Sequence, residues 1–128
     1  MLAAAHTALE RYVDVLVDPD GALAFMHAEV PCAVQSSQLA EGLAVLSVTC
    51  VLLWDLDRTA ELDGAVARMG ANVQFGGIGL LDDGKRADVT LRYVFPAAGL
   101  DSEALGMLLL LVLSSASHTR TELQAMIS

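Results

Sequence analysis

"VLLWDLDRTAELDGAV", residues 51–66, decides how the chain folds, because it joins an apolar run to an acidic one. The acids of this stretch follow Trp54 closely: Asp55, Asp57, Glu61 and Asp63. They are either a catalytic or metal-binding cluster or the corner where a buried strand is followed by a helix. Asp and Thr accept hydrogen bonds from the unpaired N–H groups at a helix start, and the helix dipole favours acids in the first turn. We therefore interpret the stretch as a corner, with Asp57 or Thr59 as the cap.

The alternative is a small metal-dependent enzyme in which Asp55 and Asp57 hold a divalent cation. No second group of His, Asp or Glu with ligand spacing accompanies this pair. The histidines have no HxH or HExxH neighbours: His6, His27 and His118. The glycine-rich "FGGIG" at 75–79 falls in an expected strand and lacks the following helix that a phosphate site needs, so its glycines indicate a bulge or a close backbone approach. We expect no catalytic residue, no metal and no cofactor.

In residues 43–54, both the odd and the even positions are mostly apolar, so both faces of an extended chain would be apolar. This pattern predicts a central strand covered on both sides. Apolar residues recur at helical spacing over 59–69 and Gly70 follows them, which predicts a helix and its end. The remaining patterns predict a helix over 2–17, strands over 22–28, 30–36, 72–81 and 87–95, and a helix from 103 to near the C-terminus.

The expected order is therefore α-β-β-β-α-β-β-α, in which hairpins alternate with flanking helices. That order predicts an α+β fold that consists of an antiparallel sheet with flanking helices. The 128 residues suit a single domain over 1–128, and no repeat, low-complexity segment or linker divides the chain.

The chain is acidic, with a net charge of −9 and only seven Lys and Arg residues. Its field repels phosphate backbones and anionic lipids, so we expect neither nucleic acid nor membrane as a partner. No signal-peptide pattern opens the sequence, and the apolar stretch 104–113 is about half the length that spans a bilayer, which favours a cytoplasmic location. Cys32 and Cys50 lack metal-site spacing and are expected to be reduced, buried thiols that act as small hydrophobic groups.

A hydrophobic content of 55% beside this charge suggests more apolar surface than one core can bury, covered by a second copy of the chain. The strand at 43–54 and the Leu-rich helix at 104–113 are apolar on every side. We expect the peptide-binding surface or the dimer interface to come from them: Leu46, Val48, Leu52, Trp54, Leu108, Leu109 and Val112.

Several stretches together resemble one known family: "LLWDLDRTAEL" at 52–62, "GANVQFGGIGLLDDG" at 70–84 and the terminal "SHTRTELQ". They are similar to actinobacterial members of the YbjN-like and type III secretion chaperone-like superfamily, also called TY-Chap, over roughly residues 9–126. One departure is Ala116-Ser117-His118, where the family often has an acidic residue after the alanine, so a polar contact there does not carry over.

The resemblance implies a non-enzymatic, chaperone-like homodimer that binds extended segments of a partner protein. Two alternatives remain open beside it. One is the metal-dependent enzyme that uses Asp55 and Asp57, and the other is a structural or regulatory dimer without a peptide client.

Overall fold

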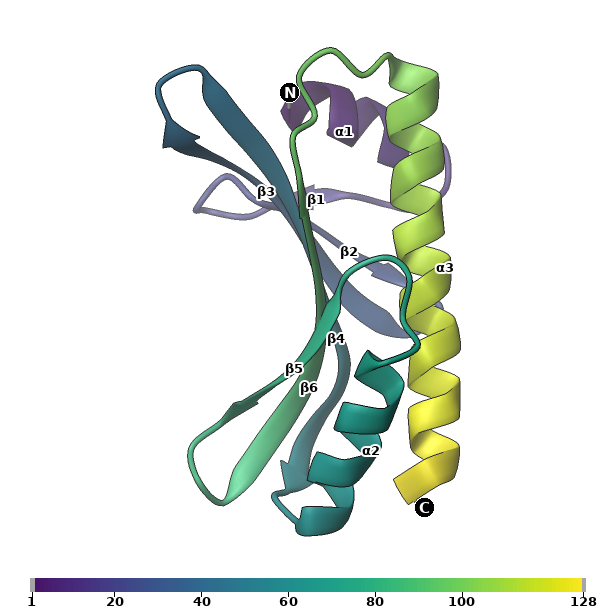
Figure 1. The fold of residues 1–128 in the computed structure, drawn as a ribbon. Helices are drawn as coiled ribbons and strands as arrows, with labels where there is room; N and C mark the ends of the chain where they lie inside the picture. The colour runs from purple at the N-terminus through teal and green to yellow at the C-terminus, as the bar shows by residue number, and fades with distance from the viewer. Residues whose placement is uncertain (1, 128) are drawn as a thin grey trace.

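The structure, a computed structural model, describes residues 2–127 as a six-stranded sheet with three helices (Figure 1). The helices are α1 (Leu2–Leu9), α2 (Ala60–Gly70) and α3 (Ser102–Ile127). The strands are β1 (Leu16–Val17), β2 (Leu23–His27), β3 (Val30–Ala40), β4 (Leu43–Asp57), β5 (Gly77–Asp82) and β6 (Arg86–Phe95). They lie side by side in the order β1-β2-β3-β4-β6-β5, and every neighbouring pair is antiparallel. The predicted α+β class with an antiparallel sheet is confirmed.

Four hairpins build the sheet, and the turns of three of them, β2–β3, β3–β4 and β5–β6, show how a left-handed backbone is obtained. Gly42 joins β3 to β4 at φ 77° and Gly84 joins β5 to β6 at φ 97°, where the absence of a Cβ removes the steric penalty. The β2–β3 turn has no glycine: Ala28 and Glu29 take φ values of 49° and 69°. Two consecutive left-handed residues in a two-residue loop match the twist of a hairpin but strain L-residues that carry a side chain.

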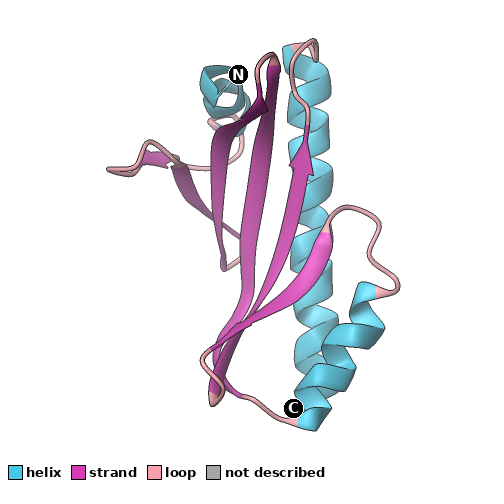
Figure 2. Ribbon diagram, turned by 60° about the vertical axis from the view of Figure 1, so that its left-hand side comes forward, coloured by secondary structure: helices cyan, strands magenta, loops and turns pink. Residues whose placement is uncertain are grey.

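All three helices lie on the same face of the sheet (Figures 1 and 2). The long helix α3 runs along the sheet, and both α1 and α2 contact it as well as the strands. The core fills the space between the sheet and this helical layer. Its fully buried large side chains include Leu9, Leu23, Val34, Leu46, Val48, Leu52, Leu91, Leu109, Leu113 and Leu123.

The position of α3 explains its apolar composition. A helix that packs on a sheet alone needs one apolar stripe, and α3 contacts α1 and α2 in addition to the sheet, which widens the stripe that it buries. Gly106 lies against α1, and a Cβ at this position would meet the Cβ of Ala8 at 3.7 Å, an ordinary van der Waals distance. The buried residues of α3, from Leu105 and Gly106 to Leu123, recur three or four positions apart and form one wide stripe, while Met107 and Leu111 lie outside it.

Four element boundaries differ from those expected. The first helix ends at Leu9 instead of 17, because Leu16 and Val17 pair with Ala24 and Leu23 as the extra edge strand β1. Strands β3 and β4 extend beyond 36 and 54 as a long hairpin, and β5 begins at Gly77 instead of 72. The order is thus α-β-β-β-β-α-β-β-α. In residues 2–127, no helix combines the length and the apolar content needed to cross a membrane.

Candidate functional site

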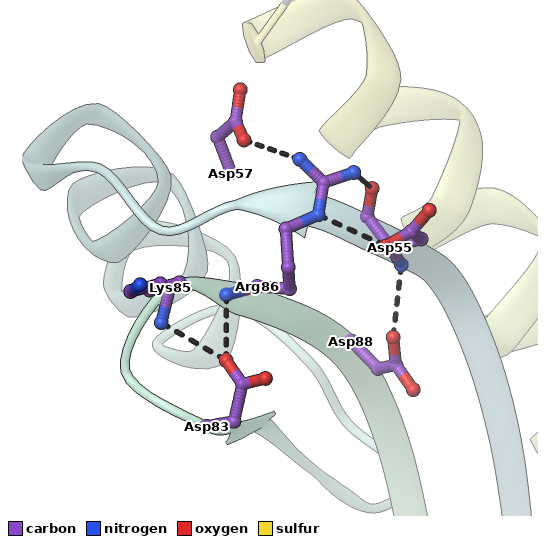
Figure 3. A network of polar contacts seen from close by, with 6 residues as sticks. All are labelled: Asp55, Asp57, Asp83, Lys85, Arg86 and Asp88. Carbon is purple, nitrogen blue, oxygen red and sulfur yellow. Dashed lines mark hydrogen bonds and ion pairs between the residues drawn. The ribbon is translucent and has the colours of Figure 1, made fainter.

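The acidic corner at the end of β4 is organised by Arg86, the first residue of β6 (Figure 3). The Arg86 Nε donates to Asp55 Oδ1 at 2.9 Å, and its other nitrogens contact the Asp57 carboxylate and the Asp55 carbonyl oxygen. Asp88, also on β6, accepts a 2.9 Å hydrogen bond from the Asp55 backbone N–H. One guanidinium therefore ties the end of β4 to the start of β6.

The electrostatics of this corner favour ionised carboxylates. The Arg86 guanidinium, by its hydrogen bond and then by its charge, lowers the pKa of Asp55. Backbone N–H groups of Arg86 and Lys85 donate to the Asp83 carboxylate and lower its pKa. A general acid at neutral pH requires a raised pKa, whereas the pKa values of Asp55 and Asp83 are lowered.

The rest of the corner is also paired internally. Arg58 contacts both Asp63, with Nε and Oδ1 2.8 Å apart, and Asp82. Thr59 begins α2: its Oγ1 accepts the Leu62 N–H at 3.1 Å, so Thr59 and not Asp57 is the cap. Across the range 2–127, no three His, Cys, Asp or Glu side chains converge as metal ligands. The ion pairs of the corner connect the end of β4 with α2, β5 and β6.

The pairing of β4 with β6 is irregular at two points, and the second lies at Trp54. Leu53 pairs with Val89 and Leu56 with Ala87, so Trp54 and Asp55 share the single β6 position of Asp88. Asp55 accordingly takes φ 56°, a left-handed conformation that Asp tolerates better than most residues. Trp54 is left 50% exposed at this bulge.

The seven residues expected at an interface fall into two groups. Five of them are at most 1% exposed within a single chain and pack in the core: Leu46, Val48, Leu52, Leu109 and Val112. Those of β4 face the helices and those of α3 face the sheet, so they present no surface to a partner in this structure. Leu108 is partly buried against the same core, and only Trp54 is half exposed. The expectation of a central strand covered by other elements on both faces is met by helices on one face only.

The second face of the sheet, which we call the open face, carries the residues that alternate with the core positions. On β3, β4 and β6 these positions lie between core residues such as Cys32, Val34, Val48, Cys50 and Leu91. One register row runs across the whole sheet: Leu16, Ala24, Ala33, Thr49, Arg92 and Gly77. Most of these side chains are small, so few large groups project from the middle of the open face.

Larger apolar side chains on the same face are exposed. Exposed fractions reach 73% for Leu16, 55% for Met26, 65% for Leu81 and 44% for Val94. Leu81 lies opposite Asp88, on the row that also holds Trp54. Such a broad face with exposed apolar side chains is the kind of surface that polypeptides cover.

An open cavity of about 580 Å³ lies where β1, β2 and β3 meet. Its lining is mostly apolar: Asp14, Leu16, Ala24, Phe25, Met26, Pro31 and Cys32. It continues the open face toward the edge strand β1, whose two residues pair only with β2.

A second exposed apolar patch lies on the helical side. Met107 and Leu111, one turn apart on α3, are 61% and 44% exposed. Tyr12 is 52% exposed and lines a cavity together with Met107. We call Tyr12, Met107 and Leu111 the helical patch. Met107 and Leu111 fall in the apolar stretch 104–113 that the sequence analysis names, and which of its residues are exposed depends on the positions of α1 and α2.

The two central glycines of "FGGIG" have different roles. Gly76 has φ 107°, and a Cβ there would lie 2.9 Å from both the Arg92 carbonyl oxygen and Leu91 Cδ2. Gly77 has open space around it. The expected close backbone approach therefore holds for Gly76 alone.

A comparison with solved structures shows a strong likeness to YbjN from E. coli, whose crystal structure is described as that of a candidate transcription regulator. The match has a TM-score of 0.68 and 13% sequence identity, and it covers 98% of this chain and 92% of that chain. This chain thus has a YbjN-like fold. No protein-family model and no curated protein matches it. The YbjN part of the expected resemblance is confirmed for the fold, while actinobacterial origin and kinship with secretion chaperones stay predictions.

Proposed function

We propose that this chain is a non-enzymatic, chaperone-like domain that forms a homodimer and binds extended segments of a partner protein on its open face. The single observation that carries the proposal is the one-sided sheet: three helices cover one face, and the other face is left open and carries exposed apolar side chains. An extended chain can lie against such a face and place alternate side chains on it.

The charges support a polypeptide partner over a nucleic acid or a membrane. Three of the seven basic residues are held in ion pairs with carboxylates: Arg58, Arg86 and Arg120. Arg92, on the open face, donates from Nε to Ser47 Oγ at 3.2 Å. A net charge of −9 with so few free cations disfavours phosphate-rich partners.

The metal-dependent enzyme is the weaker alternative. It needs Asp55 and Asp57 to be free for a cation, whereas both contact the Arg86 guanidinium. A cation would have to displace that arginine and find further ligands beyond this pair.

The proposal is tested by the aggregation of a denatured protein diluted from guanidinium chloride, followed by light scattering. We expect the wild type to suppress the scattering and the double variant Met26→Glu/Val94→Glu to lose most of this effect. Leu100→Glu is the matched control, since Leu100 is a 40% exposed residue in the loop before α3. Circular dichroism checks that each variant is folded.

Two outcomes would overturn client binding on the open face. One is a wild type that leaves the scattering unchanged at molar excess, which would favour a dimer without a client. The other is a Met26→Glu/Val94→Glu variant as effective as Leu100→Glu.

A further inference from the structure

The two cysteines lie directly opposite each other on neighbouring strands. Cys32 of β3 pairs with Cys50 of β4 in the antiparallel register, and their Sγ atoms are 3.6 Å apart. Both are free thiols, 6% and 0% exposed. They are 18 positions apart in the sequence, so only the β3–β4 hairpin brings them together.

This arrangement is close to that of a disulfide. The sulfur atoms must approach by about 1.5 Å to reach the bond length of about 2.05 Å. Both strands lie inside the sheet, where pairing with β2 and β6 keeps β3 and β4 in register. Rotation of the two cysteine side chains and small shifts of the strands can therefore bring the sulfur atoms to bonding distance.

Access to the pair is one-sided. Cys32 lines the open cavity at the meeting of β1, β2 and β3, together with Phe25 and Pro31. Cys50 lies behind it with no exposed surface. A small oxidant therefore meets Cys32 first.

We propose that Cys32 and Cys50 are an oxidation site, at which a hydroperoxide converts the two thiols into an intramolecular disulfide. The site does not depend on the proposed partner binding.

The reaction balances with hydrogen peroxide as the oxidant. Cys32 gives up its proton, and its sulfur attacks one peroxide oxygen; the O–O bond breaks, and the departing hydroxide takes a proton to become water. Cys32 is then a sulfenic acid. The Cys50 sulfur attacks the Cys32 sulfur, the S–O bond breaks, and the hydroxide leaves with the Cys50 proton as a second water. The two sulfurs together lose two electrons, which reduce the peroxide.

The surroundings make this reaction slow. The thiol of Cys50 beside it, and then burial, raise the pKa of Cys32, so little thiolate is present at neutral pH. The Cys32 thiol also donates to the Val30 carbonyl oxygen at 3.3 Å, which holds the proton on sulfur. Because the thiolate is the attacking form, we expect conversion over hours at millimolar peroxide.

The test treats the folded wild-type chain with hydrogen peroxide, denatures it, alkylates the remaining thiols with N-ethylmaleimide and maps the cysteine peptides by mass spectrometry. Peptide mapping is needed because the five methionines also oxidise. We expect both thiols to disappear together into one peptide pair linked through Cys32 and Cys50, and dithiothreitol to restore them. The oxidised protein should melt several degrees higher, because the cross-link restricts the unfolded chain.

Cys50→Ala is the control, since it leaves Cys32 without a partner. In that variant we expect oxygen addition at Cys32 and no internal cross-link. The proposal is overturned by wild-type thiols that stay open to alkylation, by oxygen addition without a cross-link, or by disulfides that form only between molecules. The wild-type map decides between these outcomes even where the variant does not fold.

Discussion

At the residue scale, the Thr59 hydroxyl caps helix α2, and the carboxylates of Asp55 and Asp57 pair with Arg86 of the neighbouring strand. We predict that Thr59→Ala lowers the free energy of unfolding by about 0.5–2 kcal/mol, because the Leu62 N–H loses its acceptor. Asp57→Ala should change the free energy of unfolding little, because both side chains of the Asp57–Arg86 ion pair are exposed to solvent. Urea denaturation of both variants measures this. A larger loss in Asp57→Ala than in Thr59→Ala would contradict the assignment of the cap.

Gly76 and Gly77 form a matched pair at the same scale. Gly76→Ala should cost about 1–3 kcal/mol, because the new Cβ meets the Arg92 carbonyl and the backbone at φ 107° is strained for any other residue. Gly77→Ala should stay close to the wild type, since nothing lies within 4 Å of its Cβ position. Thermal melting compares the stability of the two variants. Equal losses of stability would show that the close approach of the Arg92 carbonyl is not the reason why position 76 requires glycine.

At the element scale, the turn of the β2–β3 hairpin is strained, and a substitution at its two residues could relieve the strain. Replacing Ala28-Glu29 by Asn-Gly should stabilise the protein by about 1 kcal/mol, because both positions have positive φ and Asn-Gly prefers that turn. Glu29→Gln is the control: it keeps the strain and removes only the charge that faces Arg120 at 3.6 Å. If the Asn-Gly chain is no more stable than this control, the turn is not strained in solution.

The same scale shows what the sequence could and could not reveal. Alternation and turn residues predicted the class, the antiparallel sheet and the helix after the acidic corner, because these depend on local chemistry. They missed β1, since the two residues Leu16 and Val17 become a strand only through pairing with β2. They also assigned Leu46 and Leu109 to an interface, because composition reveals that a segment is apolar but not which neighbours cover it. The open face became visible only when all three helices were placed on the other side.

At the scale of the whole molecule, the helical patch is the surface that we expect two copies to share. Met107 and Leu111 lie one turn apart on a long straight helix and can pack against the same pair in a second copy. We predict a homodimer at micromolar concentration in sedimentation experiments and a monomer for Met107→Glu/Leu111→Glu. Leu109→Glu should unfold the chain instead, because Leu109 is 1% exposed in the core. A folded wild type that sediments as a monomer across this range would rule out the dimer.

The most direct test of protein binding on the open face uses Trp54, the single tryptophan of the chain. Its fluorescence is recorded while a tryptophan-free unfolded polypeptide, the oxidised B chain of insulin, is added. We predict a saturable shift of the emission to shorter wavelength, because the half-exposed indole leaves water when the polypeptide covers it. Leu81→Glu, on the same register row, should abolish the shift, and Leu100→Glu should keep it. An emission spectrum that never changes, or a shift that Leu81→Glu leaves intact, would contradict binding on the open face.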